Sequence, residues 1–428
     1  MQNIDHILSR LENGSSVAFQ QLYGADVQSH LIQKNRYSEL LRKFHATYGH
    51  TEAELFSAPG RTEIGGNHTD HNHGRVLAGA VNLDNVAVAA PNNSDIIRIE
   101  SVGYPEFEIN SSWLEPVEDE KFTSAAIVRG ICAGIRQAGF KTGGFDAVID
   151  GGVPKGSGLS SSAAFEVLVG TIISHLFNEG RIDAVKIAQL GQYAENVFFG
   201  KPCGLMDQTA SSVGGLVAID FEDPQKPVIT KVGFDFAATG FSLVITDTGG
   251  HHANLNDEYA SLPIEMKSVA RALGKEVLRQ VSLDDVINAI PSLREKTGDR
   301  AILRALHFHG DNQRVVKQVA ALQRNEFGTF LDLVVESGRS SFMYNQNIYP
   351  VTDVREQGVS LGLALSEMVL KGRGAWRVHG GGFAGTIQAF VPGDLLDEYI
   401  RTLEHVFGVG ACYKLSIRPA GAVKVDFY

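Results

Sequence analysis

The pattern of apolar and polar positions changes near residue 56. Residues 1–55 are mostly polar with scattered apolar positions such as Leu8, Leu41 and Phe44, and this spacing predicts a helical arm packed on the outside. From Phe56 onward, short runs rich in β-branched residues are bounded by Gly, Asn or Pro, which is typical of strands. The predicted strands in this part are Val76–Val81, Val86–Ala90, Ile96–Glu100, Phe145–Ile149 and Leu216–Phe221.

Helical spacing separates some of these strands and dominates later in the chain. Ala125–Ala138 has apolar residues at helical spacing, and a second helix begins near Asp183, a residue suited to cap it. Residues 255–375 are also predicted to be mostly helical. The apolar positions that recur every three or four residues along the second helix are Ile187, Leu190, Ala194 and Val197.

The last part of the chain returns to strands. Phe241–Thr246 opens a second domain, and further strands are predicted at Thr386–Val391, Lys414–Arg418 and Val423–Phe427. The pattern therefore predicts a mixed α+β protein with a helical N-terminal arm at 1–55 and two domains, at 56–235 and 236–428. A length of 428 residues agrees with two domains, because single hydrophobic cores stop growing at about 250–300 residues.

Composition narrows the class of function. The formal net charge is -11. The sequence has no cluster of Lys and Arg of the kind that binds nucleic acid, so we expect no nucleic-acid partner. Cys132, Cys203 and Cys412 lie far apart in the sequence, which predicts neither a disulfide framework nor a zinc pattern. The N-terminus lacks the features of a signal peptide, and no apolar stretch is long enough for a bilayer. We expect a cytoplasmic protein, monomeric or weakly homo-oligomeric, without a membrane partner.

Val153–Ala164 carries the most specific chemistry, with the sequence V-P-K-G-S-G-L-S-S-S-A-A. Its two glycines let a ligand approach the backbone, and its serines lead into an apolar helix. Free N–H groups and the helix dipole at such a position favour an anion, above all a phosphate. The segment is not a Walker A loop, because Lys155 precedes the glycines. The alternative is an ordinary Gly/Ser turn that caps a core helix.

Ala58–Gly74 reads as an irregular loop dense in Arg, Asn, His and Asp, with the sequence A-P-G-R-T-E-I-G-G-N-H-T-D-H-N-H-G. These side chains supply the donors and acceptors that a polyhydroxylated ligand needs. The histidines His68, His71 and His73 leave a metal site open as an alternative. The Thr, Asp and Asn between them suit a turn better than the regular ligand spacing of zinc sites.

Two further segments add chemistry. Asp207 lies in C-G-L-M-D-Q among apolar and small residues, and Glu195 precedes it on the helix that leads into this loop. Asp207 is either a helix cap or a reacting base, and two carboxylates near a phosphate loop could divide Mg²⁺ binding and contact with the nucleophile. In V-H-G-G-G-F-A-G, the glycines of 380–385 either form a tight turn or let the backbone pass close to a bulky group.

Four motifs, taken in this order, resemble the galactokinase branch of the GHMP small-molecule kinase family. They are A-P-G-R with H-T-D, P-x-G-x-G-L-S-S-S-A, C-G-L-M-D-Q and G-G-G-F-x-G, and the resemblance runs from about Ala25 to Tyr428. It implies a two-domain fold with the active site in the cleft. The N-terminal domain would resemble ribosomal protein S5 domain 2, and the C-terminal domain would be ferredoxin-like.

The resemblance also implies site residues for an ATP-dependent sugar 1-kinase. The triphosphate of ATP would lie in the loop of Gly156, Ser157, Gly158, Leu159, Ser160, Ser161 and Ser162. Ser162, with Ser161 as a near alternative, and Glu195 would hold Mg²⁺, which prefers oxygen ligands. Asp207 would accept or orient the anomeric hydroxyl proton, and Arg61 beside it would keep that carboxylate ionised. The matching sugar contacts are Asn67, His68, Asp70, Gly204 and Tyr259.

The chain departs from the galactokinase pattern at three positions. Asn67 and His71 stand where the family usually has the glutamate and tyrosine of G-E-H-T-D-Y-N. That glutamate reaches the far end of the sugar near its C6 hydroxyl, so its loss suggests a modified sugar such as galacturonate as an alternative to galactose. Ser124 stands near the tryptophan that galactokinases place beside adenine, which leaves the purine preference open.

Two other functions share parts of this pattern. The family includes sugar sensors that bind ATP and galactose without turnover, but the known sensors are damaged in the serine loop, and Ser160–Ala164 is intact here. A mevalonate- or homoserine-type kinase would share the fold, whereas the H-T-D loop and C-G-L-M-D-Q favour a sugar.

Overall fold

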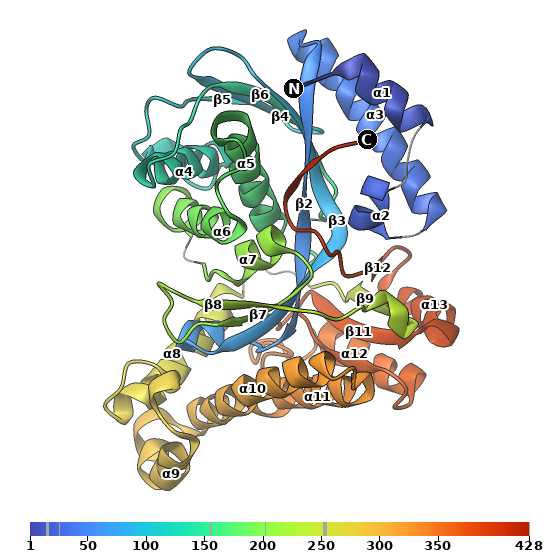
Figure 1. Cartoon of the computed structure of the whole chain (residues 1–428). Helices are drawn as coiled ribbons and strands as arrows, with labels where there is room; N and C mark the ends of the chain where they lie inside the picture. The colour runs from blue at the N-terminus through green and yellow to red at the C-terminus, as the bar shows by residue number, and fades with distance from the viewer. Residues whose placement is uncertain (14–16, 25, 155, 202, 251–254, 428) are drawn as a thin grey trace.

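The computed structural model describes residues 1–13, 17–24, 26–154, 156–201, 203–250 and 255–427. Lys155 of the glycine loop lies outside the described residues. Among the described residues, two long adjacent strands form the centre of a nine-stranded sheet (Figure 1). They are β2 (Glu52–Gly65) and β3 (Arg75–Pro91). They join the two halves of the molecule.

The two strands predicted at 76–81 and 86–90 are one strand, β3. One end of β3 pairs with β6 (Phe145–Gly151), and the other end pairs with β7 (Leu216–Asp220). The chain stays extended between the two predicted runs because β2 pairs with β3 on both sides of a register shift. The remaining strands of this sheet are β1 (Gln2–Asn3), β4 (Ile96–Ser101), β5 (Phe107–Asn110) and β8 (Val228–Val232), together with β13 (Val423–Val425).

Helices cover both faces of the upper part of this sheet. Ala87 and Ala89 of β3 belong to the core formed with α4 (Ser124–Gln137), α5 (Ser161–Asn178) and α6 (Ala184–Tyr193). Val86 and Val88, which point the opposite way, pack with the N-terminal helices. Those helices are α1 (Ile4–Asn13), α2 (Val17–Tyr23) and α3 (Val27–Tyr48). The predicted helical arm is therefore part of the hydrophobic core, and β2 begins at Glu52, before residue 56.

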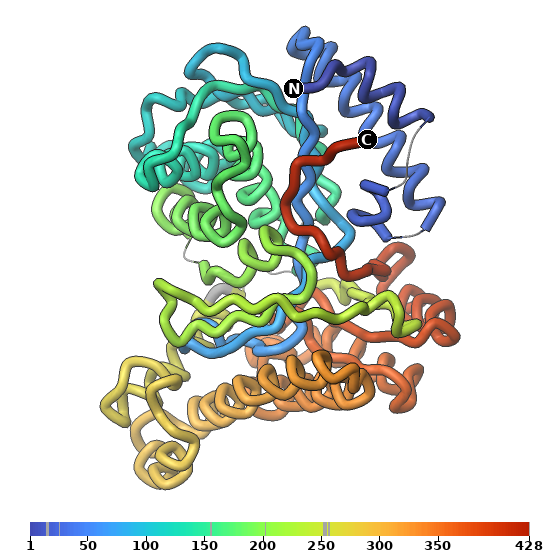
Figure 2. The backbone as a smooth tube through the Cα atoms, in the orientation of Figure 1, coloured from blue at the N-terminus to red at the C-terminus, as the bar shows by residue number. Residues whose placement is uncertain are grey.

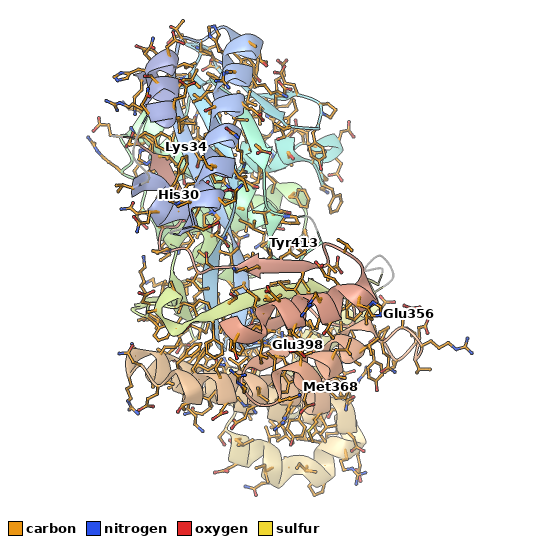
Figure 3. All side chains as sticks on the ribbon, turned by 90° about the vertical axis from the view of Figure 1, so that its right-hand side faces the viewer. His30, Lys34, Glu356, Met368, Glu398 and Tyr413 are labelled. Carbon is orange, nitrogen blue, oxygen red and sulfur yellow. The ribbon has the colours of Figure 1, made fainter. Side chains whose placement is uncertain are left out.

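A second sheet lies beside the lower part of the first in Figure 1, with strand order β10-β11-β9-β12. Its strands are β9 (Phe241–Asp247), β10 (Ala375–Val378), β11 (Thr386–Pro392) and β12 (Cys412–Leu415). Residues 256–370 are mostly helical, as expected, in α8 (Asn256–Ala272), α9 (Leu283–Thr297), α10 (Asp299–Gln323), α11 (Phe327–Ser340) and α12 (Gly358–Leu370). Figure 3 shows Tyr413 of β12 next to α13 (Leu396–Phe407), which carries Glu398.

The end of the described chain returns to the first sheet. After β12 the backbone runs upward (Figure 2), and β13 pairs with β2 at residues 55–57. The strands predicted at 414–418 and 423–427 are thus shifted or shortened, because pairing with β9 ends at Leu415 and pairing with β2 at Val425. Arg418 between them is fully buried and pairs with Asp84 of β3 at 3.0 Å.

Two local predictions are wrong for identifiable reasons. Ala58–Gly65 is strand rather than loop, and it reads as a loop only because its buried positions carry polar motif residues. Val197 is 47% exposed although its spacing suited the apolar face of the helix. The reason is that α6 passes at Ala194 into a π-helical segment, η3 (Ala194–Phe199), which rotates the following side chains.

Candidate active site

Arg61 and Asp207 form the centre of the site, although 146 positions separate them in the sequence. Arg61 lies on β2, and Asp207 is in the first turn of α7 (Met206–Val213) rather than beyond a helix end. Arg61 Nε and Nη2 donate to the two carboxylate oxygens of Asp207, each at 2.7 Å. This two-pronged pairing fixes the plane of the carboxylate.

The environment keeps Asp207 ionised. Burial opposes the charged form, but the Arg61 guanidinium and its hydrogen bonds outweigh it and hold the pKa of Asp207 below its ordinary value. Ser160 Oγ also donates to Asp207 Oδ2 at 2.5 Å. The predicted catalytic pair is therefore joined directly to the serine loop.

The serine loop is shaped by the backbone of its neighbours. Arg61 N donates to Leu159 O at 2.9 Å, and Arg61 Nη1 donates to Gly158 O. Gly158 has a left-handed conformation with φ 72°, and a Cβ there would lie 2.9 Å from His379 Nδ1. The loop thus needs glycine at 158 because β10 and β11 approach it closely.

The hydroxyls of the loop differ in their roles. Ser157 is buried and donates to Pro154 O at 2.7 Å, so it stabilises the loop itself. Ser160 is the N-cap residue of α5, but its side chain binds Asp207 instead of capping the helix. Ser161 and Ser162 occupy the first turn of α5, and Ser162 is exposed. An uncapped helix start with exposed hydroxyls is suited to bind an anion.

Glu195 lies in the π-helical segment η3, beside two other buried polar side chains. Gln208 Nε2 donates to Glu195 Oε2 at 3.1 Å and to Glu166 Oε2 at 2.8 Å. Burial and the nearby Glu195 raise the pKa of Glu166 well above its ordinary value. Glu166 Oε1 and Gln208 Oε1 have no hydrogen-bond partner although both are buried. Oxygen donors of this kind, Glu195 among them, fit a hard cation such as Mg²⁺.

The predicted sugar contacts form two groups. Asp70 lies against Gly204, where a Cβ would be 2.6 Å from Asp70 Oδ2, so a side chain at 204 would displace that carboxylate. His68 Nε2 is 2.9 Å from Gly381 O, and the Tyr259 hydroxyl donates to Gly382 O at 2.9 Å. Burial lowers the pKa of His68 to about 4. His68 is therefore neutral near pH 7.

Asn67 differs from the other predicted contacts because it is fully buried. Its Nδ2 donates to Glu63 Oε1 at 3.0 Å and to Gly380 O at 2.9 Å. Its Oδ1 accepts from Asn347 Nδ2 at 2.9 Å and from Ser341 Oγ at 3.2 Å. An amide has two donor hydrogens and two acceptor sites, so the Asn67 side chain is saturated by the protein.

Sequence reasoning missed a group of buried polar residues around this site. Arg377 pairs with Glu63 at 2.7 Å, and His379 bridges Thr62 and Thr386 at 3.0 Å each. The sequence pattern could have identified two of these residues, since Arg377 and His379 interrupt an apolar stretch just before the glycine loop. Their partners on β2, Thr62 and Glu63, lie more than 300 positions away along the chain, which no local pattern reveals.

The three histidines considered for a metal site point elsewhere. His68 binds Gly381, His71 Nε2 lies 3.9 Å from Asp70 Oδ1, and His73 has its pKa lowered by burial. Among the described residues, no group of three or more His, Cys, Asp or Glu side chains could hold a metal ion. Within the same residues, no helix combines the length and apolarity needed to span a membrane.

The fold and the serine loop joined to Asp207 define a small-molecule kinase of the GHMP class. Residues 126–215 match the model for the GHMP kinases N terminal domain, and residues 42–91 match the galactokinase galactose-binding signature. A galactokinase from Streptomyces coelicolor is 30% identical over 370 residues, which cover 85% of this chain and 91% of that protein. The chain belongs to the galactokinase family and is a sugar kinase.

Solved structures agree on the fold. A galactokinase from Lactococcus lactis, complexed with galactose, has a TM-score of 0.76 at 24% identity, covering 91% of this chain and 100% of that one. The mevalonate kinase of Methanococcus jannaschii has a TM-score of 0.61 at 13% identity, covering 86% and 98% of the two chains. The predicted two-domain GHMP kinase fold is confirmed.

Proposed function

We propose that this protein transfers the γ-phosphoryl group of ATP to the anomeric hydroxyl of galactose. The observation that carries the proposal is the chain of contacts from Arg61 through Asp207 to Ser160. It joins a carboxylate that can meet a hydroxyl nucleophile to a loop that can hold a triphosphate. Phosphoryl transfer needs mainly this kind of positioning, together with neutralisation of charge.

Asp207 orients the sugar hydroxyl rather than removing its proton in a separate step. A carboxylate with a depressed pKa is a weak base, and both oxygens of Asp207 already accept hydrogen bonds. A hydroxyl that donates to this carboxylate is held with its oxygen lone pair directed away from it, toward the loop. The proton then passes to Asp207 only as the new O–P bond forms and the bond between the γ-phosphoryl group and ADP breaks, so that ADP is the leaving group.

The nucleotide side uses the backbone of Gly156, Ser157, Gly158 and Leu159 and the hydroxyls of Ser160, Ser161 and Ser162. Ser162 and Glu195 are the residues that would hold Mg²⁺. When bound there, the cation neutralises charge on the phosphates. Lys201 Nζ lies 3.6 Å from Glu195 Oε1, so this side also carries an exposed positive charge.

The sugar side favours galactose over a sugar with a C6 carboxylate. The argument for galacturonate was the loss of a negative charge at position 67. The Glu63 carboxylate, however, lies 3.0 Å from the Asn67 amide, so an acidic group is still present there. Arg377 is already paired with Glu63 and is fully buried, so it is not free to bind a second carboxylate.

The decisive experiment is ADP release against a panel of galactose, galacturonate, galactosamine and mevalonate, with Asp207→Asn as the blank. We expect galactose to give the highest kcat/KM and the blank to lose nearly all of its turnover while it still binds ATP. A clearly higher kcat/KM for galacturonate would show that galacturonate, and not galactose, is the acceptor. ATP and galactose binding without ADP release would identify a sensor instead.

A further inference from the structure

Asn67 joins β2 to two segments that are distant in the sequence, residues 341–347 and the glycine loop. Its side chain contacts Glu63 on β2, Gly380 in the glycine loop, Ser341 in η7 (Ser341–Asn345) and Asn347 just beyond it. Its backbone is held as well, because its N–H donates to Asp311 Oδ2 at 2.7 Å and its carbonyl lies 2.9 Å from His307 Nε2. These contacts fix residue 67 to both domains.

The same contacts fix the glycine loop that faces the sugar residues. Gly380 O accepts from Asn67, and Gly381 O accepts from Asn347 at 3.1 Å. His68, next to Asn67 in the chain, reaches the same Gly381 carbonyl at 2.9 Å. A shift of Asn67 would therefore move His68 and the loop together.

Glu63 explains why position 67 carries an amide. Glu63 Oε1 accepts from both Asn67 Nδ2 and Arg377 Nη2 and has little exposure to water. A carboxylate at 67 has no hydrogen to donate, so it would face Glu63 and Gly380 O as a third acceptor. The carboxylate can stand at position 63 with the amide at 67, or the reverse. Carboxylates at both positions would repel each other.

We propose that Glu63 and Asn67 act as one positioning pair, which holds His68 and the Gly380–Gly381 loop in place around the sugar, and that a carboxylate is tolerated at only one of the two positions. The proposal rests on the proposed sugar kinase function. It assigns Asn67 to the frame of the sugar site rather than to direct contact with the C6 hydroxyl.

The test is a double-mutant cycle with isosteric changes: Asn67→Asp, Glu63→Gln and the double variant. Asn67→Asp adds a second carboxylate, so we expect the KM for galactose to rise about tenfold or more, with a lower Tm and an ATP KM within about twofold of the parent value. The double variant again has one carboxylate and one amide. Its KM for galactose and its Tm should therefore return most of the way to the parent values.

A matched control separates positioning from general destabilisation. Asn92 Nδ2 donates to Asp146 Oδ1 at 2.7 Å and to Ile96 O at 2.9 Å, which is the same pattern at the far end of β3. Asn92→Asp should lower the Tm without raising the KM for galactose. An equal rise of both KM values in Asn67→Asp would mean a structural role alone and would overturn the proposal.

Two further outcomes also contradict the proposal. They are an Asn67→Asp variant with the parent's KM and Tm, and a double variant as impaired as the sum of the single changes. If Asn67→Asp alone does not fold, folding of the double variant with a Tm near that of Glu63→Gln supports the pair, and a double variant that also fails to fold contradicts it. If the parent does not phosphorylate galactose, the sugar kinase proposal fails while the Tm cycle still tests the pair.

Discussion

The proposed nucleotide side and the proposed sugar side of this site are built in opposite ways. The nucleotide side, residues 156–162, is one continuous segment that ends at an uncapped helix start with Ser162 exposed. The sugar side, residues 63–70 with the glycine loop 380–382, is a buried network in which Asn67 has every polar atom engaged. A site for an anion must leave donors unsatisfied, whereas a site for a neutral polyol can be shaped by a rigid frame.

Asp207 stands between the two sides, so Asp207→Asn should have the largest effect. An amide keeps the size of the side chain but removes the charge that orients the nucleophile and pairs with Arg61. We expect kcat to fall about a thousandfold, with ATP binding retained by calorimetry. Appreciable residual turnover would mean that the two sides meet at another residue.

Glu195→Gln tests whether the nucleotide side depends on a cation. Replacing a carboxylate ligand weakens Mg²⁺ binding, so we expect kcat/KM for ATP to fall about a hundredfold and the Mg²⁺ concentration for half-maximal activity to rise. Glu179→Gln at the exposed end of α5 is the control and should change neither value. An unchanged Mg²⁺ requirement would remove Glu195 from the cation site.

Phe122→Ala tests whether the base of the nucleotide binds near Ser124, in the region where galactokinases commonly have a tryptophan. Phe122 is 68% exposed, has φ 63° and packs edge-on against Phe199, with ring centres 5.5 Å apart. Phe199 belongs to η3, the segment that carries Glu195. An exposed aromatic ring there can stack on a purine.

We expect Phe122→Ala to raise the KM for ATP about tenfold, since base stacking on an aromatic ring contributes about 1–3 kcal/mol. The KM for galactose should not change. Trp113→Ala, at a ring that is 61% exposed, is the matched control. Equal effects of the two variants on the ATP KM would show that neither ring is the specific platform.

The pH dependence of stability gives the smallest effect and distinguishes the two sides again. Burial lowers the pKa of His68 to about 4 and also lowers those of His307 and His379. Because the unfolded chain binds these protons near pH 6.5, the stability from the neutral histidines is complete above that pH and is lost as the pH falls toward 4.

The Tm should therefore fall across that pH range, and His68→Gln should flatten the slope. The KM for galactose should rise in the same range more than the KM for ATP. A slope that is the same in parent and variant would show that His68 titrates normally in the folded protein.

The local sequence describes the serine loop of 156–162 better than the buried network around Asn67, and the physical reason is the range of the contacts along the chain. The glycines and serines of 156–162 form one continuous loop, so their spacing in the sequence is enough to predict that loop. Arg377 reaches Glu63 across 314 positions, and Asn67 reaches Gly380 across 313. No periodicity encodes such contacts. The range Ala58–Gly65 was wrongly predicted as a loop, because a buried strand rich in polar motif residues has the composition of a loop.

The pairing of β13 with β2 bears on the order in which the chain folds. Residues 418–425 supply Arg418 to the buried Asp84 and a strand to the first sheet. They are synthesised only after the whole second sheet and its helices. The first domain to leave the ribosome therefore keeps an open edge on β2 until nearly the entire protein has been made, and until then Asp84 has Arg36 but lacks Arg418, the second of its two arginine partners.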